Sequence, residues 1–367
     1  MEKDYSTVYR PIPARLLGLF ALCLLTPCRL TADETSFNLQ AVDNYILPGY
    51  QSMADNTAAL HRESQRYCAA PSAEHLQALR ERYQLAMDSW QRMQTIRFGP
   101  IEQAMRSNRL EFWPDKRHSV ERHLSALLDK ADERQLQAAD FAAASVAVQG
   151  FSALERLLFD EAAPMKTQAS GQNGDFRCRT LMAITDNIAG IAASTLAEWH
   201  EGEHAHRALI ASAAFGNAAY GDSSEVSARL LNNLYTELEL VIDQKLEAPL
   251  GADIGQARGR RSESWRSERS LRDIRYNLDG IEQLAETAFL SRLHEASQRK
   301  TIEDAMTAAR SALAAIDNPL HKAVTDLISR PRVEVLVAAL DRLKQLIVGD
   351  LATTLEIPIG FNSLDGD

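Results

Sequence analysis

The sequence predicts an all-α protein built as two antiparallel helical bundles in one compact unit, and three observations support this prediction. Apolar residues recur at steps of three and four over most of the chain, which is the spacing of one helix face. Strict alternation of apolar and polar residues, the pattern of a half-buried strand, is almost absent. The 367 residues include only 17 glycines and 12 prolines, which disfavours a turn-rich β fold and a disordered chain.

The first 32 residues have the pattern of a secretory signal peptide. Arg10 and Arg15 precede an apolar run over residues 16–25, and polar residues follow it. A run of about ten residues is too short to cross a bilayer as a helix, which takes about 20. We therefore expect cleavage near Ala32 and a periplasmic location. The alternative is a buried core helix, but no amphipathic pattern surrounds this run.

The four cysteines are too few for a disulfide scaffold, but their positions are informative. Cys28 would be the site of a lipid anchor, yet Pro27 stands where lipidation signals have a small residue, so we expect membrane association only if lipidation occurs. Without the signal peptide the chain keeps Cys68 and Cys178. In an oxidising compartment these two are a natural disulfide pair, and two unrelated thiols are the alternative.

Helical periodicity defines the elements that follow the signal peptide. The first helix covers residues 37–67, with a kink expected near Pro48 and Gly49. The second starts near Pro71 and Ser72, because proline and a hydroxyl side chain favour a helix start. Further helices are predicted over residues 119–129, 133–160, 176–214, 224–247, 263–298, 302–315 and 332–356.

The best internal boundary lies at residues 162–175, where the helical periodicity stops. Two glycines, a proline and an asparagine fall in this stretch, and such residues favour loops. We therefore expect an N-terminal bundle over residues 36–162 and a C-terminal bundle over residues 175–358, which together form one domain.

The charge balance narrows the range of partners. Aspartate and glutamate number 50 against 40 lysines and arginines, which gives a formal net charge of −10. A surface this acidic is a poor match for a phosphate backbone, so nucleic-acid binding is disfavoured. The charge-dense stretch 258–272 mixes both signs, which predicts a solvated helix entry. Catalytic and transport roles stay open.

The segment His200-Glu201-Gly202-Glu203-His204 matches the H-E-x-x-H pattern of zinc proteases. On a helix, His200 and His204 would share a face and bind zinc, with Glu201 as the general base. Charged residues between the two histidines do not suit a helix buried beside a metal, and Gly202 weakens the helix. A polar helix end is therefore the favoured interpretation.

The helix predicted over residues 133–160 carries a polar stripe on an otherwise apolar surface. Its members are Ser145, Gln149, Ser152 and Arg156, with Glu155 nearby. The stripe is either the helix's single solvated edge or the floor of a cleft. Gly150, expected in mid-helix, would let another segment of the chain approach the stripe closely.

Two short loops place a charge beside aromatic and proline residues. They are Arg97-Phe98-Gly99-Pro100 and Phe112-Trp113-Pro114-Asp115. The simplest interpretation is loop packing, with Asp115 as the cap of the helix that follows.

Taken together, these segments resemble the imelysin family of exported bacterial proteins. The resemblance covers residues 36–356 and rests on several dispersed motifs in the right order. The matching segments are residues 68–71, the helix around Trp90 that leads to residues 98–100, residues 112–115 and 145–155, Cys178, and residues 246–251 and 263–271. The resemblance implies a double helical-bundle fold, a periplasmic or outer-membrane setting and an association with iron uptake. The family also contains metallopeptidases that cleave insulin.

The family's signature is G-x-H-x-x-E, and this chain departs from it at one position. The matching segment runs from Gly150 to Glu155, with Ser152 in the histidine position. A serine hydroxyl is a weak ligand for zinc or iron, and as a nucleophile Ser152 would need a base that its sequence neighbours do not supply. The expected protein is therefore a non-catalytic binding or accessory protein linked to iron or haem uptake.

The ligand and the partners follow from the same resemblance. Iron or another divalent metal is the expected ligand, held by hard oxygen donors such as Glu155 and Asp115. An iron species or an iron-uptake component of the envelope is the expected partner. Two alternatives stay open, which are a metal-dependent peptidase and a structural module that binds a peptide segment of a partner.

We expect the site to be a cleft between the two bundles. A glutamate on an apolar helix must be solvated, paired or used, because burying it unpaired is costly. Arg97 or Arg266 is the expected bidentate partner of Glu155. The residues expected to face this cleft are Gly150, Ser152, Glu155, Arg97, Trp113, Asp115, Arg266, Ser267 and Ser270.

Overall fold

The computed structural model describes residues 27–160, 172–202 and 205–360. Every regular element in these ranges is a helix, and no strand occurs in them, so the prediction of an all-α fold is confirmed. Residues 1–26, which make up most of the predicted signal peptide, and His204 lie outside the described residues.

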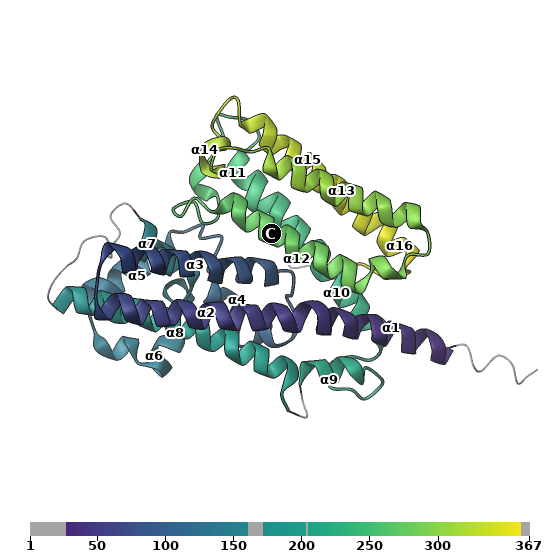
Figure 1. The fold of residues 1–367 in the computed structure, drawn as a ribbon, viewed down its shortest axis with the longest axis horizontal. Helices are drawn as coiled ribbons and strands as arrows, with labels where there is room; N and C mark the ends of the chain where they lie inside the picture. The colour runs from purple at the N-terminus through teal and green to yellow at the C-terminus, as the bar shows by residue number, and fades with distance from the viewer. Residues whose placement is uncertain (1–26, 161–171, 203–204, 361–367) are drawn as a thin grey trace, which may run out of the picture.

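The N-terminal part is one long helical rod followed by an antiparallel partner (Figure 1). Helix α1 (Pro27–Ala41) continues through a π-helical turn (Val42–Ile46) into α2 (Leu47–Ala69). This π-helical turn lies just before Pro48, where a kink was expected. Proline has no backbone N–H, so one hydrogen bond of the helix is missing there. Helix α3 (Ala73–Met93) starts at Ser72, whose hydroxyl accepts a hydrogen bond from the His75 backbone N–H at 3.1 Å.

The segment from residue 133 to residue 160 is not the single helix that was predicted. It consists of a 3₁₀ turn (Glu133–Leu136), α6 (Ala138–Ala142), a second 3₁₀ turn (Val146–Val148) and α7 (Phe151–Phe159). Gly150 is the residue before α7, not a mid-helix residue, and a Cβ there would lie 2.1 Å from the carbonyl oxygen of Leu110. The backbone at Gly150 lies directly against the backbone at Leu110. Because the helix is interrupted before α7, the predicted polar stripe along one continuous helix is wrong.

Helix α8 (Gln172–His200) is the longest helix and lies along α2. Within the described residues, Gly174–His200 is long and apolar enough to cross a membrane, but its contact with α2 is that of a core helix. The predicted disulfide between Cys68 and Cys178 is confirmed, with the two Cα atoms 5.6 Å apart. It joins the end of α2 to the start of α8 and indicates an extracytoplasmic, oxidising compartment.

The remaining helices differ from those predicted. They are α4 (Arg106–Leu110), α5 (Ser119–Lys130), α9 (His206–Ala211), α10 (Ser223–Glu239) with a π-helical continuation (Leu240–Glu247) into α11 (Ala248–Leu250), α12 (Ser270–Ala288), α13 (Ala296–Ala314), α14 (Leu320–Ala323), α15 (Arg330–Gln345) and α16 (Ala352–Thr354). Most of them are shorter or more interrupted than predicted, whereas α5 and α13 are longer. The helix predicted over 263–298 lacks its first turns, because the chain reverses at Ser264 and Glu268, which have φ of 48° and 54°. It also ends at Ala288, before a 3₁₀ turn.

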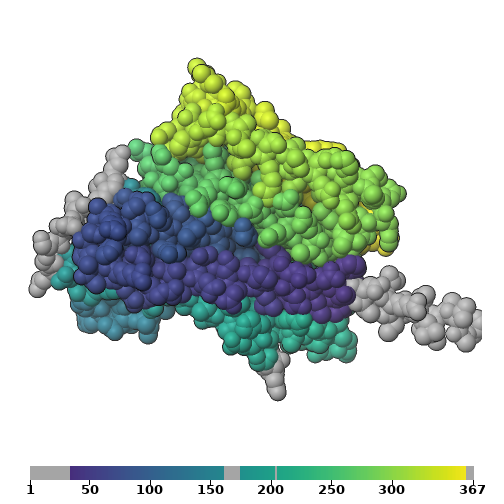
Figure 2. Space-filling view, viewed as in Figure 1, coloured from purple at the N-terminus to yellow at the C-terminus, as the bar shows by residue number. Residues whose placement is uncertain are grey.

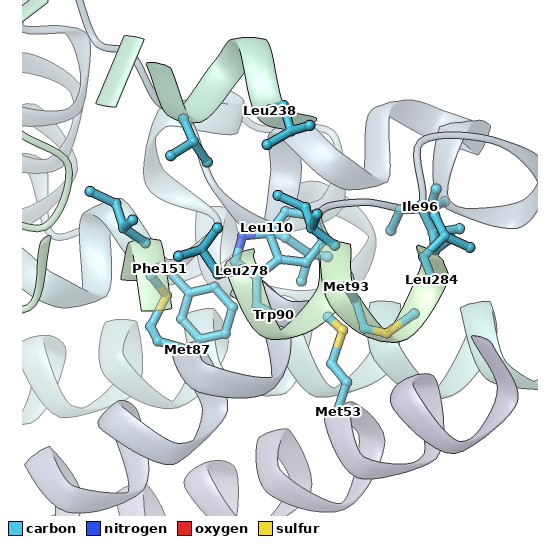
Figure 3. Close-up of a cluster of buried hydrophobic side chains, with 14 of the residues drawn as sticks. Met53, Met87, Trp90, Met93, Ile96, Leu110, Phe151, Leu238, Leu278 and Leu284 are labelled. Carbon is cyan, nitrogen blue, oxygen red and sulfur yellow. The ribbon is translucent and has the colours of Figure 1, made fainter. Parts of the chain in front are cut away.

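The helices form one compact unit with a continuous core. Helix α2 packs against both α8 and α3, α3 packs against α12, and α13 pairs with α15 (Figures 1 and 2). Side chains of α2, α3, α10 and α12 meet in a single apolar cluster, in which Met53, Trp90, Leu238 and Leu278 are labelled in Figure 3. Helix α8 follows the boundary predicted at 162–175 but packs against helices that precede it.

Candidate ligand cavity

A cavity of about 550 Å³ lies where the loop after α4, the helix α7 and the loop before α12 meet. Its volume is typical of small-molecule sites, which span roughly 300–1,000 Å³. Five of the residues expected at the site line this cavity, namely Trp113, Asp115, Ser152, Glu155 and Arg266. Four others do not line it, namely Gly150, Arg97, Ser267 and Ser270.

Glu155 is held by a loop that lies 112 residues away in the sequence. The side chain is only 6% exposed, and its Oε1 accepts hydrogen bonds from the Ser267 backbone N–H at 2.9 Å and the Ser267 hydroxyl at 2.8 Å. Burial raises the pKa of Glu155, although the hydrogen bonds from Ser267 and the charge of Arg266 oppose that shift. Ser267 therefore acts behind the cavity wall, by orienting Glu155.

The expected bidentate pairing of Glu155 with an arginine is wrong. Arg97 instead pairs with the buried Glu237 at 2.7 Å, and Arg266 lies 3.3 Å from Asp160. Each of these arginines is paired with another carboxylate, and Glu155 accepts its hydrogen bond from the backbone N–H of Ser267 instead.

Ser152 and Asp115 are both engaged with the backbone. The Ser152 hydroxyl donates to the carbonyl oxygen of Phe112 at 3.2 Å. The Asp115 carboxylate accepts from the backbone N–H groups of Ser119 at 2.8 Å and Val120 at 2.9 Å. Asp115 thus caps the start of α5, as the loop-packing interpretation predicted.

A buried polar network forms the rear of the cavity, and the sequence did not reveal it. Glu111 lines the cavity and accepts from the Trp90 indole N–H at 2.6 Å and the Gln94 amide at 3.0 Å. Burial raises the pKa of Glu111 well above its usual range, and the nearby Glu263 adds to that shift. Glu263 forms an ion pair of 2.8 Å with Lys245, which is also buried.

The Lys245 ammonium has several partners besides Glu263. The Lys245 ammonium donates to Gln91 at 2.7 Å, to Gln94 at 2.9 Å and to Asn277 at 2.9 Å. Burial alone would lower the pKa of Lys245, but the carboxylate of Glu263 and other acids raise it. The ammonium therefore stays charged behind the cavity.

The loop before α12 is not the solvated helix entry that its mixed charges predicted. Glu263 and Arg269 are buried, and the Arg269 guanidinium contacts Asp273 at 2.6 Å and Asp88 at 3.0 Å. Burial raises the pKa of Asp273 to about 6, against the opposing charge of Arg269. These contacts fix the loop against α3, which positions Ser267 beneath Glu155.

A second cavity of about 700 Å³ adjoins the first. Both are lined by Glu121, Arg156, Arg260, Trp265 and Arg266, so they form one continuous depression, called the arginine groove below. Two guanidinium groups lie near the Trp265 ring, with the Cζ of Arg266 4.4 Å and the Cζ of Arg260 5.2 Å from its centroid.

The histidines of the H-E-x-x-H segment lie elsewhere. His200 is at the end of α8, with its Nδ1 3.8 Å from a carboxylate oxygen of Glu201, and neither residue lines either cavity. In the described ranges no cluster of three or more histidine, cysteine, aspartate or glutamate side chains is arranged to hold a metal ion. His204 lies outside the described residues, so the structure does not test the zinc pairing of His200 with His204, which the sequence disfavours.

The fold, the disulfide and the cavity together define an extracytoplasmic, all-helical protein with a ligand-sized polar depression. The family model of imelysin matches residues 46–347, so the chain belongs to the imelysin family. The resemblance stated from the sequence is thereby confirmed.

Relatives support this assignment and add one indication of function. The chain is 25% identical over 357 residues to iron-regulated protein A of Synechococcus elongatus, with 94% of this chain and 90% of that protein covered. An imelysin-like protein from Psychrobacter arcticum has a similar structure, with a TM-score of 0.74, 20% identity and coverage of 90% of this chain and 98% of the other. A protein from Parabacteroides distasonis, described as an iron-regulated protein A precursor, also has a similar structure. Its TM-score is 0.69 and its sequence identity is 16%, with coverage of 86% of this chain and 93% of the other.

Proposed function

We propose that this protein is an exported, non-catalytic binding or accessory protein that acts in iron or haem uptake in the bacterial periplasm. The observation that carries the proposal is the cavity at Ser152 and Glu155, the positions that the resemblance in sequence assigns to the family's signature. Family membership and the disulfide support an extracytoplasmic role, and a relative named iron-regulated protein A supports the link to iron.

The contacts of Ser152 and Glu155 favour binding over turnover. The Ser152 hydroxyl donates to a backbone carbonyl, whereas a serine nucleophile would donate to a general base. Glu155 is fixed by Ser267 at the cavity wall, which suits a residue that orients a ligand. A carboxyl group with a raised pKa can donate a hydrogen bond as well as accept one, so its protonation state adjusts to the ligand.

The proposal is tested by complementation of a deletion strain under iron starvation. The deletion should slow growth in iron-poor medium and leave growth in iron-rich medium unchanged. The wild-type protein and the control Glu303→Gln, which alters an exposed glutamate of α13, should restore growth. Glu155→Gln should not restore it, although it preserves the size of the side chain. Normal growth of the deletion strain, together with no binding of any iron species by the pure protein, would refute the proposal.

The second candidate is a metal-dependent peptidase, which the family's peptidase members favour. It requires about one zinc or iron ion per chain and a proteolytic activity that a chelator abolishes. Loss of that activity in His204→Ala would assign it to the H-E-x-x-H segment. Loss in Glu155→Gln alone would assign it to the cavity.

A further inference from the structure

The carboxylates that lie nearest the arginines of the arginine groove are paired with only two of them. Glu121 lies 3.1 Å from Arg156, while Asp160 lies 3.5 Å from Arg156 and 3.3 Å from Arg266. These two carboxylates therefore balance these two arginines.

The other carboxyl groups of the first cavity are bound by partners other than arginine. The Asp115 oxygens accept from backbone N–H groups at the start of α5. Glu111 accepts from Trp90 and Gln94, and Glu155 accepts from Ser267.

Two arginines of the groove are left without a carboxylate partner within the described ranges, beside the exposed Lys116. Arg260 and Arg261 are exposed, both line the first cavity, and neither forms an ion pair with a carboxylate of the described residues. Arg260 is instead held against the face of Trp265. An arginine stacked on an aromatic ring keeps its N–H groups directed outward in one plane, which is the arrangement that binds a carboxylate with two hydrogen bonds.

We infer that the arginine groove binds a small polycarboxylate anion through Arg260 and Arg261, with the ligand's apolar part against Trp265 and Trp113. Polycarboxylates bind iron(III) through hard oxygen donors, which suit this ion, and keep it in solution as an anionic chelate. The anion site follows from the groove alone. That the bound anion carries iron rests on the function proposed above.

The test is calorimetric titration of the mature protein with citrate, ferric citrate and inorganic phosphate. Wild-type protein should bind citrate or ferric citrate more tightly than phosphate, and the affinity should fall as salt is added. The double variant Arg260→Gln/Arg261→Gln should bind at least roughly tenfold more weakly, because it loses two charge-assisted contacts. The control Arg275→Gln/Arg342→Gln removes two exposed arginines of α12 and α15 and should bind like wild type.

The outcomes separate this inference from the proposed function. Equal affinities in the two double variants, no binding of either citrate form, or equal binding of phosphate would each overturn the polycarboxylate site. Iron-dependent growth could still require the protein in that case, which would leave the proposed function standing. Conversely, arginine-dependent binding of iron-free citrate by a protein whose deletion has no effect at low iron would support the site and refute the iron role.

Discussion

Removal of the disulfide between Cys68 and Cys178 should destabilise the protein by an amount that follows from its position in the chain. The bond closes a loop of 110 residues, which joins the end of α2 to the start of α8. In the chain-entropy model a loop of this length restricts the unfolded chain by about 16 cal/mol/K, which corresponds to about 5 kcal/mol at room temperature. The double variant Cys68→Ser/Cys178→Ser should lose about that much free energy of unfolding.

Two measurements check this prediction. Thiol titration of the denatured, oxidised wild-type protein should find no free cysteine in the mature chain, and urea unfolding should give the difference in free energy between wild type and variant. Wild-type protein treated with reductant should behave like the double variant, which controls for the serine substitutions. Two reactive thiols in the untreated protein, or a difference below about 1 kcal/mol, would refute the reasoning.

Three further predictions concern the interior. Lys245→Met should destabilise the protein by about 3–5 kcal/mol in urea unfolding, because Glu263 is left buried without its cation, and Lys245→Met/Glu263→Gln should recover part of the loss. Gly150→Ala should destabilise by about 1–3 kcal/mol because its Cβ meets a carbonyl oxygen, whereas Gly190→Ala, in open space on α8, should stabilise by about 0.5–1 kcal/mol. A Gly150→Ala protein that melts at or above the wild-type temperature would contradict the close contact with Leu110. Because burial raises the pKa of Asp273 to about 6, the folded state binds its proton more tightly than the unfolded state does, so this residue's contribution to stability falls as the pH rises from about 4 to about 6. The stability of Asp273→Asn relative to wild type should therefore rise over that range, and a pH-independent difference between the two proteins would reject the assigned pKa.

The fold class and the disulfide were predictable because both depend on local or countable features. Helical periodicity is a property of short windows, and two lone cysteines in an exported chain have one obvious partner each. The error at Gly150 has a different origin. A helical wheel assumes an unbroken helix, whereas this chain is interrupted by the approach of Leu110, a contact across 40 residues that periodicity does not report.

The sequence indicated residues that lie at one cavity, but it did not predict their hydrogen-bond partners. Ser152, Glu155 and Arg266 line that cavity, whereas the partner of Glu155 is the backbone of Ser267 and not an arginine. A sequence pattern shows which side chains are available, but it does not show whether a backbone N–H or a guanidinium will be the hydrogen-bond donor to a given carboxylate. The pair of Lys245 and Glu263 was missed because charged residues in a polar stretch are normally solvated, and only the tertiary fold buries these two.

The position of α2 also has a consequence for when the chain can fold. One side of α2 is covered by α3, which follows it directly, but another is covered by residues 172–200, which are synthesised more than a hundred residues later. Helix α3 in turn waits for α12 at residues 270–288. Contacts between such distant segments form slowly, because a long loop must close before they contribute. An emerging N-terminal half therefore cannot complete its core alone, and this delay would keep an exported chain unfolded for long enough to be threaded through a translocation channel.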